Sequence, residues 1–206
     1  MRSDALATVL EHPAVWRRNR PAPRRDAVAT GWDALDALLP DHGWPASGLC
    51  ELLLAHDGLG EMELLMPALR TLARRQRHIV WVCPPYLPYP PALAARELPL
   101  RQLGVIAAPP AQAAWAMEQC LRAGCCGGVL GWLPRVDYRQ LRRLQIAAVG
   151  GAALAFLMRP LEQVGEASPA ALRLRIYRKE SNICVDVLKS KGSFVPGTAL
   201  HWRACG

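Results

Sequence analysis

The sequence predicts a three-layer α/β fold with a mostly parallel central sheet and antiparallel strands at its C-terminal end. Short apolar runs alternate with longer amphipathic segments between residues 49 and 158. These runs are too continuously apolar to leave one face in water, which is typical of parallel strands covered by helices on both sides. After residue 158 the pattern changes to alternating apolar and polar residues, which favours antiparallel strands.

Each element follows from its local pattern. Branched and apolar runs bounded by turn residues predict strands at 49–54, 79–83, 105–107, 128–133 and 152–158. Apolar residues at helical spacing predict helices at 61–76, 92–97, 111–123 and 138–149. Pro67 lies inside the first of these helices and is expected to kink it. A loop at 159–170 precedes three alternating strands at 172–178, 183–189 and 198–202, with a tight turn at 179–182.

The composition is that of one globular domain. The chain has 206 residues, of which 51% are hydrophobic and 20% charged, enough to bury a full core. We expect residues 1–29 to form a short helix, about residues 4–11, and an arginine- and proline-rich linker, and residues 30–206 to form the compact domain. No apolar run reaches a membrane-spanning length and the N-terminus lacks a secretory segment, so we expect a cytoplasmic protein without membrane contact.

The chemistry-bearing residues do not suggest an enzyme. The seven cysteines are odd in number, form no C-x-x-C pair and lie mostly in apolar segments, as reduced core thiols do. The five histidines are scattered, and no G-x-S-x-G motif occurs. We therefore expect no catalytic residues, no metal and no cofactor.

The segment AHDGLGEM, residues 55–62, lies between the first expected strand and the first expected helix, where a phosphate-binding loop would lie. The pattern G-x-x-x-x-G-K-[ST] needs a lysine for the phosphates and a hydroxyl for magnesium. The aligned residues are Ala55, Gly60, Glu61 and Met62. An acid in the lysine position costs about 4 kcal/mol against one phosphate charge at ~4 Å and an effective dielectric of ~20. We therefore expect no ATP binding, and an ordinary strand-to-helix turn explains these residues equally well.

The residues before this loop carry a family resemblance. Thr30–Asp36 and Gly43–Pro45 resemble the segment that precedes the phosphate loop in the RecA recombinase family. Over roughly residues 5–195 the chain more closely resembles the ImuA family, RecA-related bacterial proteins of damage-induced translesion synthesis. The segments that carry this resemblance are TGWDALDALLPDHGWP, ELLL, GLGE, ELLMPAL, WVCPPYLPYPPALA, RRLQIAA and LKSKG.

The resemblance implies a RecA-like fold without a working nucleotide site. Pro84-Pro85 stands in place of the water-activating glutamate, Gly131-Trp132 in place of the acidic strand end, and Arg159 in place of the nucleotide-sensing glutamine. The implied function is a non-catalytic accessory protein of a damage-inducible, error-prone DNA synthesis complex. The implied partners are an ImuB-type Y-family polymerase homologue, an error-prone replicative-type DNA polymerase and RecA itself.

Two alternatives stay open. The chain is also similar to cell-division inhibitors of the SulA type, which block assembly of the division protein FtsZ, over GGVLGWLPR and GAALAFLMRP. The Thr30–Glu51 lead-in disfavours this alternative, because that family is shorter at its N-terminus. The third reading is a DNA-binding ATPase in which a neighbouring subunit supplies an arginine to offset Glu61.

The charge is unevenly distributed, with a net +8 overall but no Lys or Arg and seven acids between Thr30 and Leu69. The candidate DNA- or partner-binding residues are Arg17, Arg18 and Arg20 in the linker, Arg135, Arg139, Arg142 and Arg143 on the helix after Pro134, and Lys189 and Lys191 at a strand end. A solvated surface is the alternative for each group. The loop after residue 158 carries Glu162 and Glu166 and is expected not to hold DNA.

Two further expectations concern protein contacts. An acidic first half and a basic remainder suit docking onto charged partners, or head-to-tail contact with a RecA-like subunit, so an oligomer is allowed. Trp32 and Trp44 lie in expected loops and are candidate interface anchors.

Overall fold

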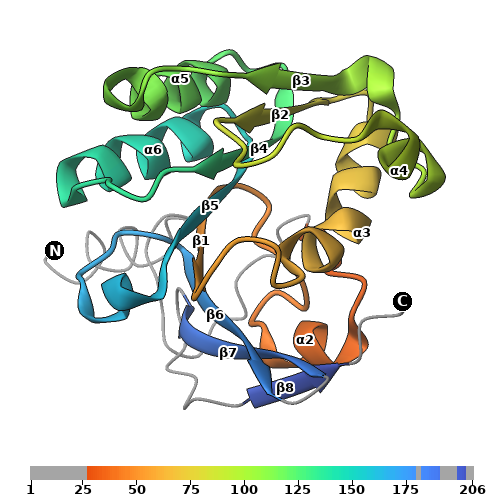
Figure 1. Ribbon diagram of the computed structural model, residues 1–206, viewed down its shortest axis with the longest axis vertical. Coiled ribbons are helices and arrows are strands. Elements are labelled where there is room, and N and C mark those ends of the chain that lie inside the picture. Colours follow the sequence, from red (N-terminus) through yellow and green to blue (C-terminus); the bar gives the residue numbers. More distant parts are fainter. Residues whose placement is uncertain (1–26, 180–181, 191–198, 203–206) are drawn as a thin grey trace, which may run out of the picture.

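The computed structural model describes residues 27–179, 182–190 and 199–202 (Figure 1). The strands are β1 Gly48–Leu54, β2 His78–Val82, β3 Leu103–Ile106, β4 Cys126–Trp132, β5 Leu154–Pro160, β6 Leu172–Lys179, β7 Asn182–Ser190 and β8 Ala199–Trp202. The helices are α2 Asp33–Leu38, α3 Glu61–Arg74, α4 Pro90–Ala95, α5 Pro110–Arg122 and α6 Tyr138–Gly150, with short 3-10 turns η1 Leu100–Gln102 and η2 Leu161–Gly165. The expected helix at about 4–11, the linker arginines Arg17, Arg18 and Arg20, and Lys191 lie outside the described residues.

The described strands form one sheet in the order β3-β2-β4-β5-β1-β6-β7-β8. Pairing is parallel from β3 through to β6 and antiparallel between β6, β7 and β8. The α/β class and the mostly parallel sheet with an antiparallel C-terminal extension are confirmed. The register places Glu51 of β1 opposite Arg173 of β6 and Leu157 of β5.

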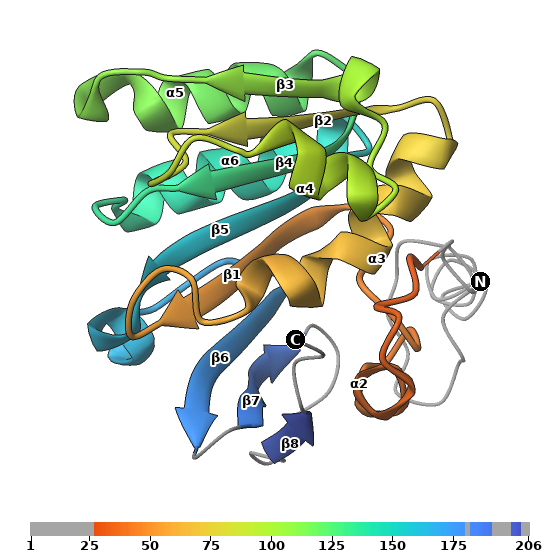
Figure 2. The same ribbon diagram turned by 45° about the vertical axis from the view of Figure 1, so that its right-hand side comes forward.

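Helices cover both faces of this sheet (Figure 2). On one face, α2, α3 and α4 pack on a core that includes Leu35, Leu64, Leu93 and Phe156. On the other face, α5 and α6 pack on a second core. Continuous burial of β1, β4 and most of β5 explains why their sequences are apolar throughout rather than alternating.

The segment before β1 is part of the domain core. Trp44 is fully buried, packs edge-on against Phe156 with ring centroids 5.0 Å apart, and pairs through its backbone with Val28. The expectation that Trp44 is an interface anchor is therefore wrong: a loop position does not imply exposure when the loop folds back on the sheet. Trp32 is half-buried and packs against the same core.

Helix α3 runs continuously through Pro67 to Arg74. Gly31 lies against this proline: it has a φ of +83°, and an added Cβ would be 2.5 Å from the Pro67 Cβ. A side chain at position 31 would be strained and would clash, so this glycine is needed for the lead-in to pack on α3. None of the helices in the described part of the chain is long and apolar enough to cross a membrane.

Candidate functional site

The loop between β1 and α3 closes on its own side chain. Gly58 and Gly60 both have positive φ angles, +80° and +107°. Their N–H groups donate to the two carboxylate oxygens of Glu61, at 3.0 and 3.1 Å respectively. The Glu61 residue is only 4% exposed. The backbone donors that a phosphate-binding loop would offer to a ligand are thus taken by an internal anion.

This arrangement changes the reason for expecting no ATP binding. A phosphate would have to displace the Glu61 carboxylate from both N–H groups, in addition to being repelled by it. Met62 is half-buried and packs against the core on the α3 face, while Ala55 is exposed. The four residues therefore build a strand-to-helix turn, and the absence of ATP binding stays a prediction.

A buried ion network lies behind this loop, on the other face of the sheet. Glu51 and Arg159 have fully buried side chains, with 3.5 Å between the Glu51 Oε2 and Arg159 Nη1 atoms. Arg173 donates from Nε to the same oxygen at 3.1 Å. The Ser168 hydroxyl donates to the other carboxylate oxygen of Glu51. Two guanidinium groups and a hydroxyl therefore compensate one carboxylate inside the sheet.

The network also fixes the loop that follows β5. Arg159 donates to Glu166 at 2.9 Å and to the Val136 carbonyl at 3.1 Å. Arg173 donates to the carbonyls of Gln163 and Val164 at 3.1 and 3.3 Å. The position that the resemblance assigned to a lost nucleotide sensor, Arg159, is thus a structural residue.

Lys189 belongs to the same loop contact. Its Nζ donates to the Ser168 carbonyl at 2.6 Å. Partial burial and the neighbouring Arg173 lower the pKa of Lys189, which the Glu51 carboxylate opposes. Lys189, one of the two lysines predicted as candidate binding residues at a strand end, therefore has a hydrogen-bond partner within the chain.

The arginines of α6 do not form one equivalent group. The helix begins with a capping box, in which Gln140 N–H donates to the Asp137 side chain at 2.7 Å. Arg143 pairs at 2.6 Å with Glu118 of α5, a residue only 3% exposed that also binds Arg122 at 2.9 Å. Arg143 therefore ties α6 to α5. Arg135, Arg139 and Arg142 are exposed, and none of the described carboxylates forms an ion pair with them.

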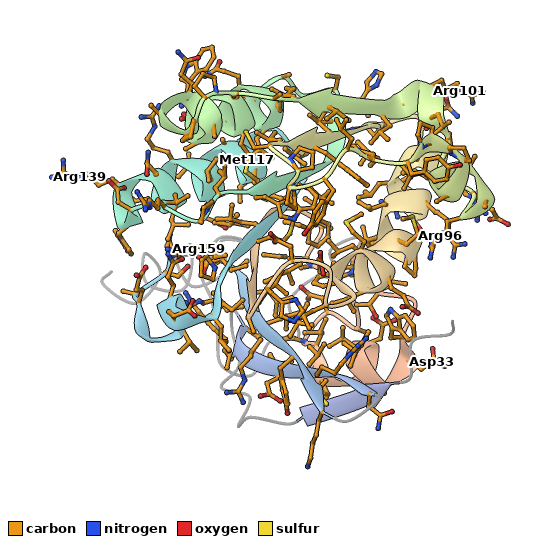
Figure 3. All side chains as sticks on the ribbon, in the orientation of Figure 1. Asp33, Arg96, Arg101, Met117, Arg139 and Arg159 are labelled. Carbon is orange, nitrogen blue, oxygen red and sulfur yellow. The ribbon has the colours of Figure 1, made fainter. Side chains whose placement is uncertain are left out.

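The most exposed of the large apolar side chains in the described part of the chain lie in the proline-rich loop between β2 and α4. Tyr86, Leu87 and Tyr89 are 73%, 90% and 68% exposed. Exposed arginines lie beyond α4, where Figure 3 shows Arg96 and Arg101 at the corner between α4 and β3. In the sequence, three large apolar residues alternate with prolines here, and this pattern is the signal that could have indicated an exposed contact loop.

A hollow of about 250 Å³ opens at the carboxyl ends of β1, β4 and β5. Its lining includes His56, Asp57, Trp132 and Arg159. Among the described residues, no group of three or more His, Cys, Asp and Glu side chains is placed to hold a metal ion. The six described cysteines are all free thiols, and burial raises the pKa of Cys126 to about 12.

Comparison with known proteins points to one family. The family model described as "Cell division inhibitor SulA" matches residues 49–155. Cell division inhibitor SulA proteins of Yersinia pestis (strain Pestoides F) and Yersinia pseudotuberculosis (strain IP 31758) are 34% identical over 123 residues, covering 56% of this chain and 70% of theirs. The crystal structure of SulA from Pseudomonas aeruginosa aligns with a TM-score of 0.46 and 25% identity over 54% of this chain and 97% of that one.

These matches correct the function expected from the ImuA resemblance. A translesion-synthesis accessory is wrong as the main interpretation, because the matching family model and the curated relatives are cell division inhibitors. In the sequence, the Thr30–Glu51 lead-in disfavours the division inhibitor, because that family is shorter at its N-terminus. The family match begins at residue 49, so the lead-in lies almost wholly outside the segment that decides the family.

Proposed function

Because the chain belongs to the SulA family of cell division inhibitors, we propose that it is an SOS-induced inhibitor of division that binds FtsZ and blocks its assembly. In this proposal the protein acts in the cytoplasm by binding its partner and does not catalyse a reaction. Its main support is the family match over residues 49–155, from β1 to the start of β5 with the helices between. An exposed apolar loop inside the matched segment supplies a contact surface.

We assign the FtsZ contact to that loop, residues 84–89. Tyrosine and leucine side chains that stand free of the core gain most from being covered by a partner. Pro84, Pro85 and Pro88 restrict the backbone, so little conformational entropy remains to be lost on binding. Leu87, which is 90% exposed, is the side chain with the most area to bury.

Positive charges lie beyond α4, the helix that follows the loop, and would favour an acidic surface on the partner. Arg96 and Arg101 are exposed beyond α4. Arg74 donates to Glu97 at 2.9 Å and Arg70 lies 3.8 Å from the same carboxylate, so one acid is shared between two bases. This excess of positive charge steers an acidic surface toward the apolar loop and contributes more to the association rate than to affinity.

The test is inhibition of GTP-dependent assembly of FtsZ from the same organism, measured by sedimentation of polymer. The full chain should lower the amount of polymer in proportion to its concentration. Leu87→Asp should need at least about tenfold more protein for the same effect, because a hot-spot side chain contributes about 2 kcal/mol or more. Val164→Asp is the matched control, since Val164 is an apolar residue 41% exposed in the η2 turn.

Two results would contradict the proposal at different levels. An unaltered polymer yield with the wild-type chain at excess would exclude FtsZ inhibition. A Leu87→Asp variant as potent as wild type would exclude this loop as the contact while leaving the inhibition in place. Circular dichroism of each variant checks that the fold is kept.

We also propose that residues 30–62 derive from a RecA-like ancestor that has lost nucleotide binding. The support is the lead-in resemblance together with the Glu61 carboxylate seated on the loop N–H groups. This is a proposal about descent and leaves the proposed activity unchanged. Calorimetric titration with Mg-ATP tests it, and binding at micromolar affinity would contradict it.

A further inference from the structure

Three of the described cysteines come together where α5 ends and β4 begins. Helix α5 ends at Arg122 and leads through a short turn, residues 123–125, into β4 (Figure 1). Cys120 lies in the last turn of the helix, Cys125 ends the connecting turn, and Cys126 begins the strand. The Sγ atoms of Cys125 and Cys126 are 4.0 Å apart. Neither the buried ion network nor the proposed FtsZ contact uses these thiols.

The end of α5 turns Cys125 back toward Cys120. Gly124 has a φ of +72°, the left-handed conformation that commonly closes the C-terminal end of a helix. The residue after such a glycine commonly contacts the third residue before the helix cap, which is Ala123 here, so that residue is Cys120. Burial raises the pKa of Cys120, and the neighbouring Cys125 thiolate raises it further, as expected for two sulfur atoms that lie near each other.

The three thiols differ in their access to solvent. Cys125 is exposed, Cys120 is half-buried and Cys126 is only 3% exposed. The thiolate, rather than the thiol, is the nucleophile in cysteine chemistry. Burial above all keeps Cys126 protonated, with a pKa of about 12. An oxidant in solution therefore meets Cys125 first.

We propose that Cys125 and Cys120 form an oxidation site for hydroperoxides, at which the two thiols become a disulfide. The Cys125 thiolate attacks one oxygen of hydrogen peroxide, the O–O bond breaks and hydroxide leaves, which gives a sulfenic acid on Cys125. The Cys120 sulfur then attacks the sulfenic sulfur, the S–S bond forms and the sulfenic oxygen leaves as water. In total the two thiols lose two electrons and two protons, and the peroxide is reduced to water.

The geometry favours Cys120 over Cys126 as the partner of Cys125. A trans peptide bond holds the Cα atoms of adjacent residues about 3.8 Å apart, which is below the range of about 4.4 to 6.8 Å found for disulfides. Oxidation of Cys125 to a neutral sulfenic acid also removes the charge that raises the pKa of Cys120. The first step therefore makes the second easier, and the disulfide keeps Cys125 from irreversible oxidation to the sulfinic acid.

Peptide mapping of the oxidised chain tests the proposal. Trypsin cleaves after Arg122, so Cys120 falls in the peptide 102–122, whereas Cys125 and Cys126 share the peptide 123–135. The folded full chain is treated with hydrogen peroxide, its free thiols are blocked with iodoacetamide, and the digest is analysed by mass spectrometry without reduction. We expect the two peptides to be joined as the main disulfide product. The same treatment in urea should give a mixture of disulfides, because the helix end is then lost.

Single variants identify the two sulfur atoms. Cys125→Ser should abolish the joined peptides, and Cys126→Ser is the matched control that should keep them. In Cys120→Ser, the joined peptides should be lost and dimedone should trap a sulfenic acid on Cys125. Circular dichroism of each variant before oxidation checks that the fold is kept.

Three results would overturn the proposal. Oxidation of Cys125 without any joining of the two peptides would show that Cys120 does not reach it. A disulfide confined to the peptide 123–135 would assign the reaction to Cys125 and Cys126. Joined peptides that persist in Cys125→Ser would make Cys126 the partner of Cys120. None of these measurements involves FtsZ, so their outcome is separate from that of the proposed function.

Discussion

Replacing Glu51 by glutamine should remove much of the stability of the domain. The substitution keeps the size of the side chain and deletes its charge, leaving Arg159 and Arg173 buried without the carboxylate that both contact. Removing one partner of a buried ion pair costs about 3 to 5 kcal/mol. A domain of this kind has about 5 to 15 kcal/mol of unfolding free energy in total. Glu51→Gln should therefore lose about a fifth or more of it.

Urea unfolding followed by circular dichroism measures this loss. At this chain length, about 2 to 4 °C in Tm corresponds to 1 kcal/mol, so the expected thermal shift is about 6 to 20 °C. Glu162→Gln is the control: it removes an exposed carboxylate from the same loop and should change stability by less than about 0.5 kcal/mol. A loss below about 1 kcal/mol in Glu51→Gln would refute a buried, charged network.

A second variant separates charge from packing. Changing Glu51 to Leu together with Arg159→Met and Arg173→Leu removes the charges as a set and keeps the buried volume. Such replacements are often close to neutral, because no charge is left without a partner. The triple variant should therefore lose less stability than Glu51→Gln alone. A larger loss would mean that these side chains act mainly through the loop carbonyls that they bind.

Three further predictions follow from other contacts. Burial raises the pKa of Cys50 and Cys126 above the usual thiol value of 9.0. Above pH 9 the unfolded chain therefore releases protons that the folded chain keeps, and the free energy of unfolding should fall by up to about 1.4 kcal/mol per pH unit and thiol. Urea midpoints at pH 8 and 10 check this, and Cys126→Ala should flatten the slope. Glu61→Ala should destabilise the chain by about 1 to 3 kcal/mol, because it leaves two N–H groups without their acceptor. No loss of stability would contradict the role of Glu61 as the internal anion of this loop. Calorimetry should detect no Mg-ATP binding to the wild-type chain. Arg143→Ala should lower the free energy of unfolding in urea by about 1 to 2 kcal/mol, because Glu118 keeps only Arg122 as a partner. Arg142→Ala is the control and should be near neutral. Equal effects of the two variants would contradict the pairing of Arg143 with Glu118.

Most of the regular elements could be predicted from periodicity. The continuous apolar run at β1 and the alternating runs at β6 and β7 differ because helices cover the first on both faces, and that difference is visible in sequence. Helix α2 was not expected, because six residues give too little periodicity to indicate a helix. The burial of Trp44 depends on its packing against Phe156, more than a hundred residues away in the chain, which no local pattern reports.

The candidate site was less predictable for a related reason. The sequence shows that Glu61 stands in the lysine position, but only the three-dimensional turn shows that its carboxylate binds the N–H groups of Gly58 and Gly60. Likewise, Arg143 belongs to the same helical flank as Arg139, and the Glu118 partner that sets it apart comes from another helix. Charged residues inside otherwise apolar strands, as at Glu51 and Arg173, were a readable signal of a buried network.

Groups of the chain itself occupy much of the sheet edge at which a ligand would bind. In a parallel sheet, ligands usually bind at the carboxyl ends of the strands. Here that edge holds its own anion at Glu61, and the ion network of Glu51 ties down the loop after β5. Tyr86, Leu87 and Tyr89, on the loop before α4, are the most exposed of the large apolar side chains in the described part of the chain, and Trp115 of α5 and Ile146 of α6 are exposed as well. The loop assigned to FtsZ leaves the carboxyl end of β2, so the proposed contact uses the same edge of the sheet, through exposed apolar side chains rather than through a ligand pocket.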